Sequence, residues 1–281
     1  MNSEAVNSPS PVCPEGPRVV TEARMDAPQT FTFHSGEAVY YSDRSPDKDT
    51  PNEDSAVLIP VDASRTILAV ADGMGGRPLG AEASRTAVEH LLAAAAVCGP
   101  EEASLRPAIL DALENANQDL VERRNGAGTT AVVTEIVDGW LRPYHVGDST
   151  VLVVGQRGKV KVHTVAHSPV GYAVEAGLLD ENEAMHHEER HLVSNLVGAA
   201  DMRIEMGSRV KLAPRDTVLL ASDGLVDNLD PSEITAAVRV GPLDRAAIRL
   251  VETARERMHA PREGQPSKLD DLTFILYRQT R

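Results

Sequence analysis

The sequence predicts an α+β fold in which antiparallel sheets pack between helices. Strand-like segments follow one another in groups instead of alternating strictly with helices, which argues against a doubly wound parallel sheet. Three long segments show helical periodicity and supply the covering layers. A chain of 281 residues with 42% hydrophobic and 25% charged residues can bury a substantial core.

Ten apolar or alternating segments have the length and composition of strands. They are 38–41, 56–61, 66–71, 129–137, 141–146, 151–154, 160–165, 204–212, 217–222 and 272–277. The expected helices are 81–97, 103–124 and 243–258. In the first helix Val88, Leu91 and Leu92 share one apolar face, while Glu82 and Glu89 point away from it.

Residues 1–30 contain five prolines among Ser, Glu and Asn, and we expect a flexible leader because this composition buries little apolar surface. Residues 31–281 lack a Gly-, Ser- or Pro-rich linker and are expected to form one domain, with a flap insert at about 166–203. Two cysteines, no secretory signal and no long apolar run predict a cytoplasmic protein without a membrane span. A net charge of −14 and 3% aromatic residues argue against a nucleic-acid partner.

Carboxylates gather at four predicted strand ends or turns, within 52–55, 71–76, 222–225 and 269–272. Asp72 and Asp223 directly follow apolar runs, where an unpaired charge is costly to bury. A hard divalent cation with oxygen ligands would supply the counter-charge. These segments therefore predict a metal site built from carboxylates.

Each acidic segment also has a simpler interpretation. Asp-Gly pairs are common in turns, and alternation at Asp270–Asp271 would send only one of the two acids inward. Gly73 permits a close backbone approach, so its carbonyl could bind a cation beside Asp72. Because the same pattern recurs at several strand ends, we favour a two-metal site.

A second metal pattern lies in the insert. Residues 187–191 match H-E-x-x-H, in which two imidazoles on one helical face bind zinc. The match is short, and Glu183, Glu188 and Glu189 indicate a solvated segment. We favour surface histidines here.

The chain resembles the PPM-type (type 2C) metal-dependent serine/threonine protein phosphatases, particularly their bacterial members, over about residues 35–279. The resemblance rests on six segments in the family's order, 52–55, 72–76, 128–130, 147–149, 222–225 and 270–273. It implies an antiparallel β-sandwich flanked by helices on both sides, in α-β-β-α layers, with the metals in a cleft at one edge. Residues 187–198 are similar to the family's flap.

The resemblance also implies roles for individual residues. Asp72 would bridge two Mn²⁺ or Mg²⁺ ions, with Glu53 and the Gly73 carbonyl on one ion and Asp223 and Asp270 on the other. Asp72 and Asp223, the catalytic candidates, would position the metal-bound water.

Two further acids are assigned by the same resemblance. Asp54 would act through hydrogen bonds or bound water, and Asp148 matches the acid that helps to hold a third, weaker ion. The chain departs from the family at Asp271, where Asn is usual, and at Thr150, where a basic residue is usual.

The main departure concerns the substrate phosphate. The family usually has an arginine four residues before Glu53, and this chain has Asp49 there. A carboxylate cannot make the bidentate phosphate contacts of a guanidinium. Arg44, Lys48 and Arg77 are candidate replacements, and the sequence does not choose among them.

The resemblance implies hydrolysis of phosphoserine and phosphothreonine in proteins by a metal-activated water, without a covalent phosphoenzyme, opposing a Ser/Thr kinase. Asp49 motivates an alternative, a catalytically weak relative that binds or regulates phosphoproteins. A metal-dependent phosphoesterase for small molecules is the third reading. The sequence leaves the oligomeric state open.

Overall fold

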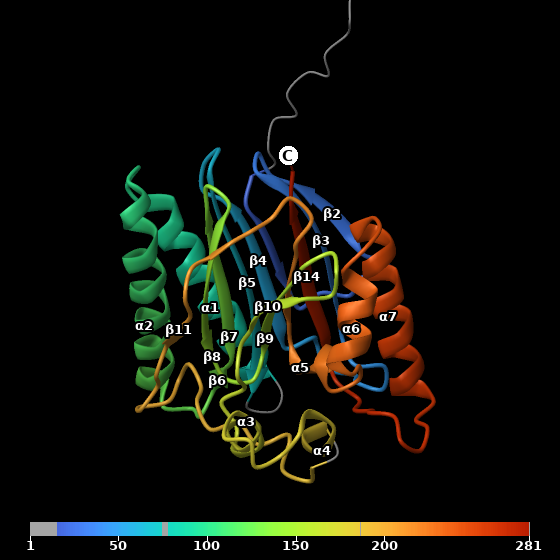
Figure 1. Ribbon diagram of the computed structural model, residues 1–281. Helices are drawn as coiled ribbons and strands as arrows, with labels where there is room; N and C mark the ends of the chain where they lie inside the picture. Colours follow the sequence, from blue (N-terminus) through green and yellow to red (C-terminus); the bar gives the residue numbers. More distant parts are fainter. Residues whose placement is uncertain (1–15, 75–77, 186, 281) are drawn as a thin grey trace, which may run out of the picture.

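Two antiparallel sheets lie face to face in the structure, a computed structural model that describes residues 16–74, 78–185 and 187–280 (Figure 1). Helices cover the outer face of each sheet, so the layers follow the order α-β-β-α. This arrangement confirms the predicted α+β class and its antiparallel sandwich.

The first sheet has the strand order β1-β4-β5-β7-β8-β11, and β6 and β12 pair with β5 and β8. Its strands are β1 (Arg18–Thr21), β4 (Asp54–Pro60), β5 (Arg65–Met74), β6 (Gly128–Thr129), β7 (Ala131–Val137), β8 (Trp140–Val146), β11 (Glu205–Met206) and β12 (Val210–Lys211). Successive side chains point to opposite faces. Val57 and Ile59 therefore pack under the helices, while Ala56 and Leu58 fill the space between the sheets.

The second sheet has the order β10-β9-β13-β14-β3-β2. Its strands are β2 (Gln29–Thr32), β3 (Gly36–Asp43), β9 (Thr150–Val154), β10 (Val160–His163), β13 (Thr217–Ala221) and β14 (Leu272–Gln279). Leu220 and Ile275 face the first sheet, whereas Leu219 and Phe274 face the outer helices. Because both faces of each sheet are covered, the central strands are almost continuously apolar.

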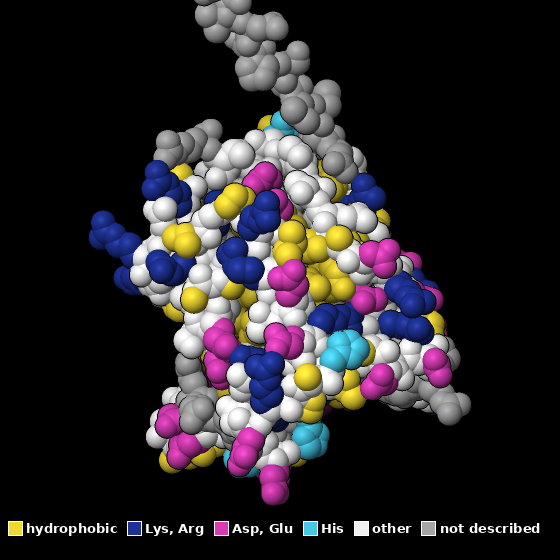
Figure 2. All heavy atoms as spheres, turned by 90° about the vertical axis from the view of Figure 1, so that its right-hand side faces the viewer, with side chains coloured by type: hydrophobic (Ala, Val, Ile, Leu, Met, Phe, Trp, Pro, Cys, Tyr) yellow, Lys and Arg dark blue, Asp and Glu magenta, His cyan; other side chains and the backbone are white. Residues whose placement is uncertain are grey.

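The outer helices divide between the two sheets. The first sheet is covered by α1 (Pro78–Val97) and α2 (Leu105–Arg123), which follows the 3-10 helix η1 (Glu102–Ser104); the second is covered by α5 (Asp223–Val226), α6 (Pro231–Val238) and α7 (Leu243–His259). Acidic and basic side chains are interspersed on the face that carries α7 (Figure 2). None of the helices in the described ranges is long and apolar enough to cross a bilayer.

The insert contains two short helices, α3 (Pro169–Glu175) and α4 (Glu181–Met185), at the end of the molecule drawn lowest in Figure 1. Ser168 caps α3 by accepting a hydrogen bond from the Gly171 N–H group at 2.9 Å. Residues 187–203 form turns and coil, apart from an isolated β-bridge between Val197 and Thr129.

Several expected boundaries were wrong. The flexible leader does not extend to residue 30, because β1 pairs with β4 and β2 pairs with β3, with Val20 and Phe31 buried; residues 1–15 of it lie outside the described residues. The expected strand 204–212 divides into β11 and β12, and α5 and α6 were not anticipated. Asp270 and Asp271 precede β14 instead of opening it.

Candidate active site

The acidic segments meet at one end of the two sheets. β5 runs to Met74, so Asp72 lies within the strand, directly opposite Asp54 of β4. Asp223 is the first residue of α5, immediately after β13, and Asp270 lies just before β14, the strand that pairs with β13. Antiparallel pairing thus brings residues far apart in sequence to the same edge.

Four of the predicted acids line one cavity of about 250 Å³. They are Asp72, Asp148, Asp223 and Asp270, and they share the cavity with Gly73, Met74, His191, Val193 and Lys268. Glu53 lies beside it, because the Gly73 N–H group donates to the Glu53 carbonyl at 3.2 Å. We call Glu53 and the four lining acids the carboxylate cage.

The cage is short of positive charge. Burial raises the pKa of Asp72 well above its usual value, and the negative charges of Asp223 and Asp54 add to this effect. Burial and Asp223 also raise the pKa of Asp148 to about 7 and the pKa of Asp270 to about 6. Acids with raised pKa values resist ionisation, and a bound cation would stabilise their ionised form.

Lys268 provides the counter-charge on one side of the cage. Its Nζ lies 2.9 Å from Oδ2 of Asp270 and 3.2 Å from Oδ2 of Asp227, and it also pairs with Oδ2 of Asp223. Burial alone would lower the pKa of Lys268, but the three carboxylates raise it. It is the only Lys or Arg among the described residues that line the cavity. The sequence analysis missed it, although it stands two residues before Asp270.

Lys48 is paired with Glu53, another acid of the cage. Its Nζ lies 2.6 Å from Oε2 of Glu53 and 2.6 Å from Oδ2 of Asp271. The Asp271 carboxylate also accepts hydrogen bonds from the Ser45 and Glu53 N–H groups, at 2.8 and 2.7 Å. Asp271 thus holds the loop that carries Glu53, which gives its carboxylate a structural role.

Gly73 is required by close packing at the cage. A Cβ atom there would lie 2.1 Å from the Gly80 carbonyl oxygen and 2.6 Å from the Glu53 carbonyl oxygen. Only glycine allows β5, the Glu53 loop and the start of α1 to approach so closely. The expected pair of neighbours, Gly73 and Glu53, is therefore present.

The donor set fits hard divalent cations. Oε1 of Glu53 and Oδ1 of Asp223 are buried without a hydrogen-bond partner, which is costly for a carboxylate. The four lining acids and the Gly73 carbonyl offer oxygen atoms, which Mg²⁺ and Mn²⁺ prefer, and the described lining includes no cysteine. The residues thus suit the cations that the sequence implies.

The remaining candidates among the described residues do not line the cavity. Asp54 is buried behind Asp72 and accepts a hydrogen bond from the Ser222 hydroxyl at 2.8 Å; burial and Asp271 raise its pKa. Arg44 and the exposed Asp49 are not among the lining residues, and Arg77 lies outside the described residues.

The H-E-x-x-H segment does not have the helical geometry that a zinc site of this pattern requires, which agrees with the interpretation favoured above. Helix α4 ends at Met185, and His187 and His191 lie in the irregular segment that follows, so they share no helical face. His191 instead lines the cage cavity.

A second cluster, His145, His167 and Glu205, places three candidate ligand atoms within 4.8 Å of one another. Nδ1 of His167 accepts hydrogen bonds from the Gly147 N–H group at 3.1 Å and from Nδ2 of Asn195 at 2.8 Å. Its proton must therefore sit on Nε2, which lies 3.2 Å from Glu205. A protonated Nε2 cannot bind a metal, so the cluster ties the insert to β8.

The fold and the cage define a class of proteins, namely α-β-β-α sandwiches with a carboxylate-lined cavity at one edge. The chain belongs to the protein phosphatase 2C family, since the family model described as Protein phosphatase 2C matches residues 44–263. The predicted resemblance and the predicted enzyme class, a protein phosphatase, are confirmed.

Individual relatives agree with this assignment. Protein phosphatase PhpP of Streptococcus pneumoniae serotype 2 (strain D39) is 33% identical over 196 residues, which cover 66% of this chain and 78% of the relative. The serine/threonine phosphatase of S. agalactiae is 28% identical, with a TM-score of 0.74 over 86% of this chain and 99% of that structure. The catalytic domain of PstP, solved in complex with two manganese ions, has a TM-score of 0.69 at 24% identity over 88% of this chain and 99% of that structure.

Proposed function

We propose that the carboxylate cage carries the serine/threonine phosphatase activity of this family by binding two divalent cations, Mn²⁺ or Mg²⁺. The observation that carries the proposal is the convergence of four acids from four separate segments on one cavity. The raised pKa values of Asp72, Asp148 and Asp270 support it, because bound cations would offset the burial and the mutual repulsion that raise them.

The ligands would divide between the two ions. Asp72 would bridge them, with Glu53 and the Gly73 carbonyl on one ion and Asp223 and Asp270 on the other. Asp148, on the same cavity, would contribute to a third and weaker site. Bound ions would activate water and neutralise charge on the phosphoryl oxygens.

The chain's own residues position these ligands. The 2.8 Å hydrogen bond from the Ser222 hydroxyl to Asp54 joins the residue before Asp223 to β4, which pairs with the strand that carries Asp72. Asp271 holds the Glu53 backbone. The cage is therefore preorganised by strand pairing and buried hydrogen bonds, as electrostatic catalysis requires.

We assign the substrate phosphate to Lys268. Its ammonium lies in the cavity, whereas Lys48 is bound to Glu53 and Asp271. When cations take over Asp223 and Asp270, the Lys268 ammonium would keep its pair with Asp227 and would have N–H donors free for the phosphate. Lysine can serve as a point-charge phosphate ligand where the family's arginine is absent.

The substrate would be a phosphoprotein, which implies an opposing Ser/Thr kinase. Relatives named as protein phosphatases support this reading over a small-molecule phosphoesterase. They also do not favour the alternative of a catalytically weak binding protein. The free thiol of Cys98 fits a reducing compartment, and we place the reaction in the cytoplasm.

A phosphothreonine peptide with added Mn²⁺ tests the proposal. We expect turnover that EDTA abolishes, and a loss of about a thousandfold in Asp72→Asn and Asp223→Asn. Asp119→Asn, on the exposed side of α2, is the matched control. Unchanged turnover in both cage variants would rule out the assigned roles.

A further inference from the structure

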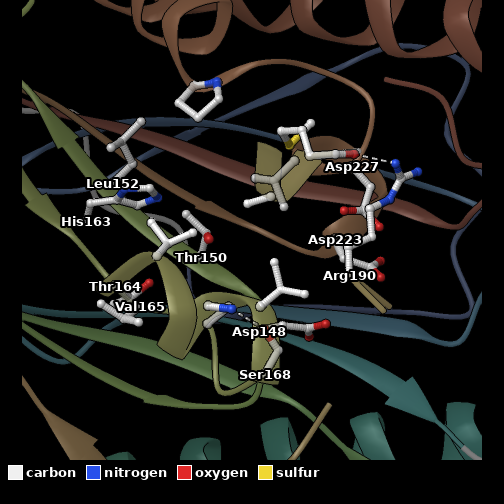
Figure 3. A pocket seen from close by; sticks show the side chains of 18 of the residues that line it. Asp148, Thr150, Leu152, His163, Thr164, Val165, Ser168, Arg190, Asp223 and Asp227 are labelled. Carbon is white, nitrogen blue, oxygen red and sulfur yellow. Dashed lines mark hydrogen bonds between the residues drawn. The ribbon is translucent and has the colours of Figure 1, made fainter. Parts of the chain in front are cut away.

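A second cavity, of about 370 Å³, adjoins the carboxylate cage (Figure 3). It lies between the β9–β10 edge of the second sheet, the insert helices α3 and α4, and the segment from α5 to α6. We call this cavity the flap pocket. Asp148 and Asp223 line both cavities, so the flap pocket is a direct neighbour of the cage cavity.

The wall of the flap pocket is mainly apolar. Leu152, Leu219 and Ile234 form part of the wall and belong to the hydrophobic core between the second sheet and its helices. Val170 and Val174 of α3 form part of the opposite wall. The pocket thus extends the core to the surface, and an apolar group placed in it would be removed from water.

Several polar groups of the wall already have partners within the chain. The Thr164 hydroxyl accepts a hydrogen bond from the Val151 N–H group at 2.9 Å, and Ser168 caps α3. The Arg190 guanidinium donates to the carbonyls of Met185, at 2.5 Å, and Ser267, at 3.2 Å. Because these polar groups are already hydrogen-bonded within the chain, they are not available to bind a charged ligand in the pocket.

Acidic side chains on the pocket wall disfavour a carboxylate occupant. Asp148, Asp223, Asp227 and Glu175 line it, and Arg190 is its only Lys or Arg among the described residues. Asp227 and Glu175 lie outside the proposed ligand set, so a carboxylate occupant would meet like charge there, whereas an uncharged apolar group would not. The wall therefore favours an apolar occupant.

Exposed apolar residues continue this surface around both cavities. Tyr172 and Leu178 of the insert are 38% and 77% exposed. Leu192 follows His191, and Leu269 precedes Asp270; they are 42% and 49% exposed. Apolar surface of this kind around a pocket is typical of sites for a protein segment.

We propose that the flap pocket receives an apolar side chain of the phosphoprotein substrate, a few residues from the phosphorylated one. The inference rests on the proposed function, because a phosphate at the cage fixes the substrate chain beside the pocket mouth. The cage would then recognise the phosphate, and the flap pocket would select the neighbouring sequence.

A phosphothreonine peptide series tests this selection. Leu, Ala and Asp are placed in turn at each position within three residues of the phosphothreonine, and kcat/KM is measured with Mn²⁺. We expect Leu at one or two positions to exceed Ala by about tenfold, and Asp to fall below Ala there. Equal rates for all peptides would overturn the inference.

Variants that fill the flap pocket test whether the Leu preference arises there. Val174→Trp and Ala184→Trp should reduce the Leu preference to less than about twofold, with Val97→Trp on exposed α1 as the control. Thermal unfolding and turnover of a small aryl phosphate identify variants that remain folded with an intact cage. Val174→Asp provides a second test without added bulk. A Leu preference that survives in these folded variants would contradict the assignment.

The same assays separate the two proposals. No Mn²⁺-dependent turnover of the aryl phosphate would refute the proposed function, whereas turnover without sequence preference would refute only the flap pocket as a substrate site. If the original protein self-associates and Val174→Trp abolishes this while the Leu preference stays intact, the pocket is assigned to a second copy and the inference is overturned.

Discussion

Nζ of Lys268 lies 2.9 Å from Oδ2 of Asp270, so a lysine side chain supplies positive charge to the carboxylate cage. The same ammonium lies 3.2 Å from Asp227 and also pairs with Asp223. A metal ion that binds Asp223 and Asp270 must compete with this ammonium. Lys268 therefore links metal affinity to phosphate binding.

Lys268→Met should change these two affinities in opposite directions. Mn²⁺ should bind about three- to tenfold more tightly, because its ligands lose a competing partner, and inorganic phosphate should bind the Mn²⁺-loaded protein about tenfold more weakly. Isothermal titration calorimetry measures both. Lys161→Met is the control, since Lys161 forms a similar pair with Asp216, 2.5 Å away, and neither residue lines the cage cavity. Unchanged affinities for Mn²⁺ and phosphate would show that Lys268 takes no part in binding either of them.

Gly73→Ala should destabilise the protein by about 1–3 kcal/mol, because the new Cβ would lie 2.1 Å from the Gly80 carbonyl oxygen. The displaced Glu53 loop should also weaken Mn²⁺ binding. Urea unfolding and calorimetry give the two quantities. A Cβ at Gly16 would have no neighbour within 4 Å, so Gly16→Ala should stay within about 0.5 kcal/mol of the original protein. If Gly73→Ala is as stable as the original protein, the backbone at residue 73 can move away from the Gly80 carbonyl without cost, and the prediction is wrong.

Stability of the metal-free protein should depend on pH through Asp148 and Asp270. Their folded pKa values, about 7 and about 6, exceed the unfolded value of 3.8. The folded state therefore binds more protons, and the stabilising contribution, complete below about pH 4, is lost as pH rises through 6 and 7. Urea unfolding in EDTA measures this decline. Asp148→Asn with Asp270→Asn should flatten it, and an unchanged slope in that variant would contradict the assignment.

Asp49→Arg tests the missing phosphate arginine. Asp49 is exposed and does not line the cage cavity, whereas Lys268 does. If Lys268 anchors the phosphate, the added guanidinium should raise kcat/KM less than about threefold in the original protein, and more in Lys268→Met. A gain above about tenfold in the original protein would instead support the weak-relative alternative.

Four acids of the cage were predictable because each lies next to an apolar run visible in the sequence, whereas Asp148 was assigned through the resemblance. Asp72 and Asp223 were found in this way, and the structure places both on one cavity. The strands β1 and β2 were missed for the opposite reason. Residues such as Gln29 and Thr30 carry little apolar signal, and they form a strand because β3 offers them an edge.

By itself the sequence determined the α+β class, most of the central strands and the identity of the acids, because local apolar periodicity and strand-end chemistry are written in short segments. Only the tertiary structure decided that Lys268 stands among Asp223, Asp227 and Asp270, and that Asp271 holds the Glu53 loop. It also decided that the insert leaves an apolar pocket beside the cage. These relationships join residues through chain folding, and no local pattern encodes the distance between such partners.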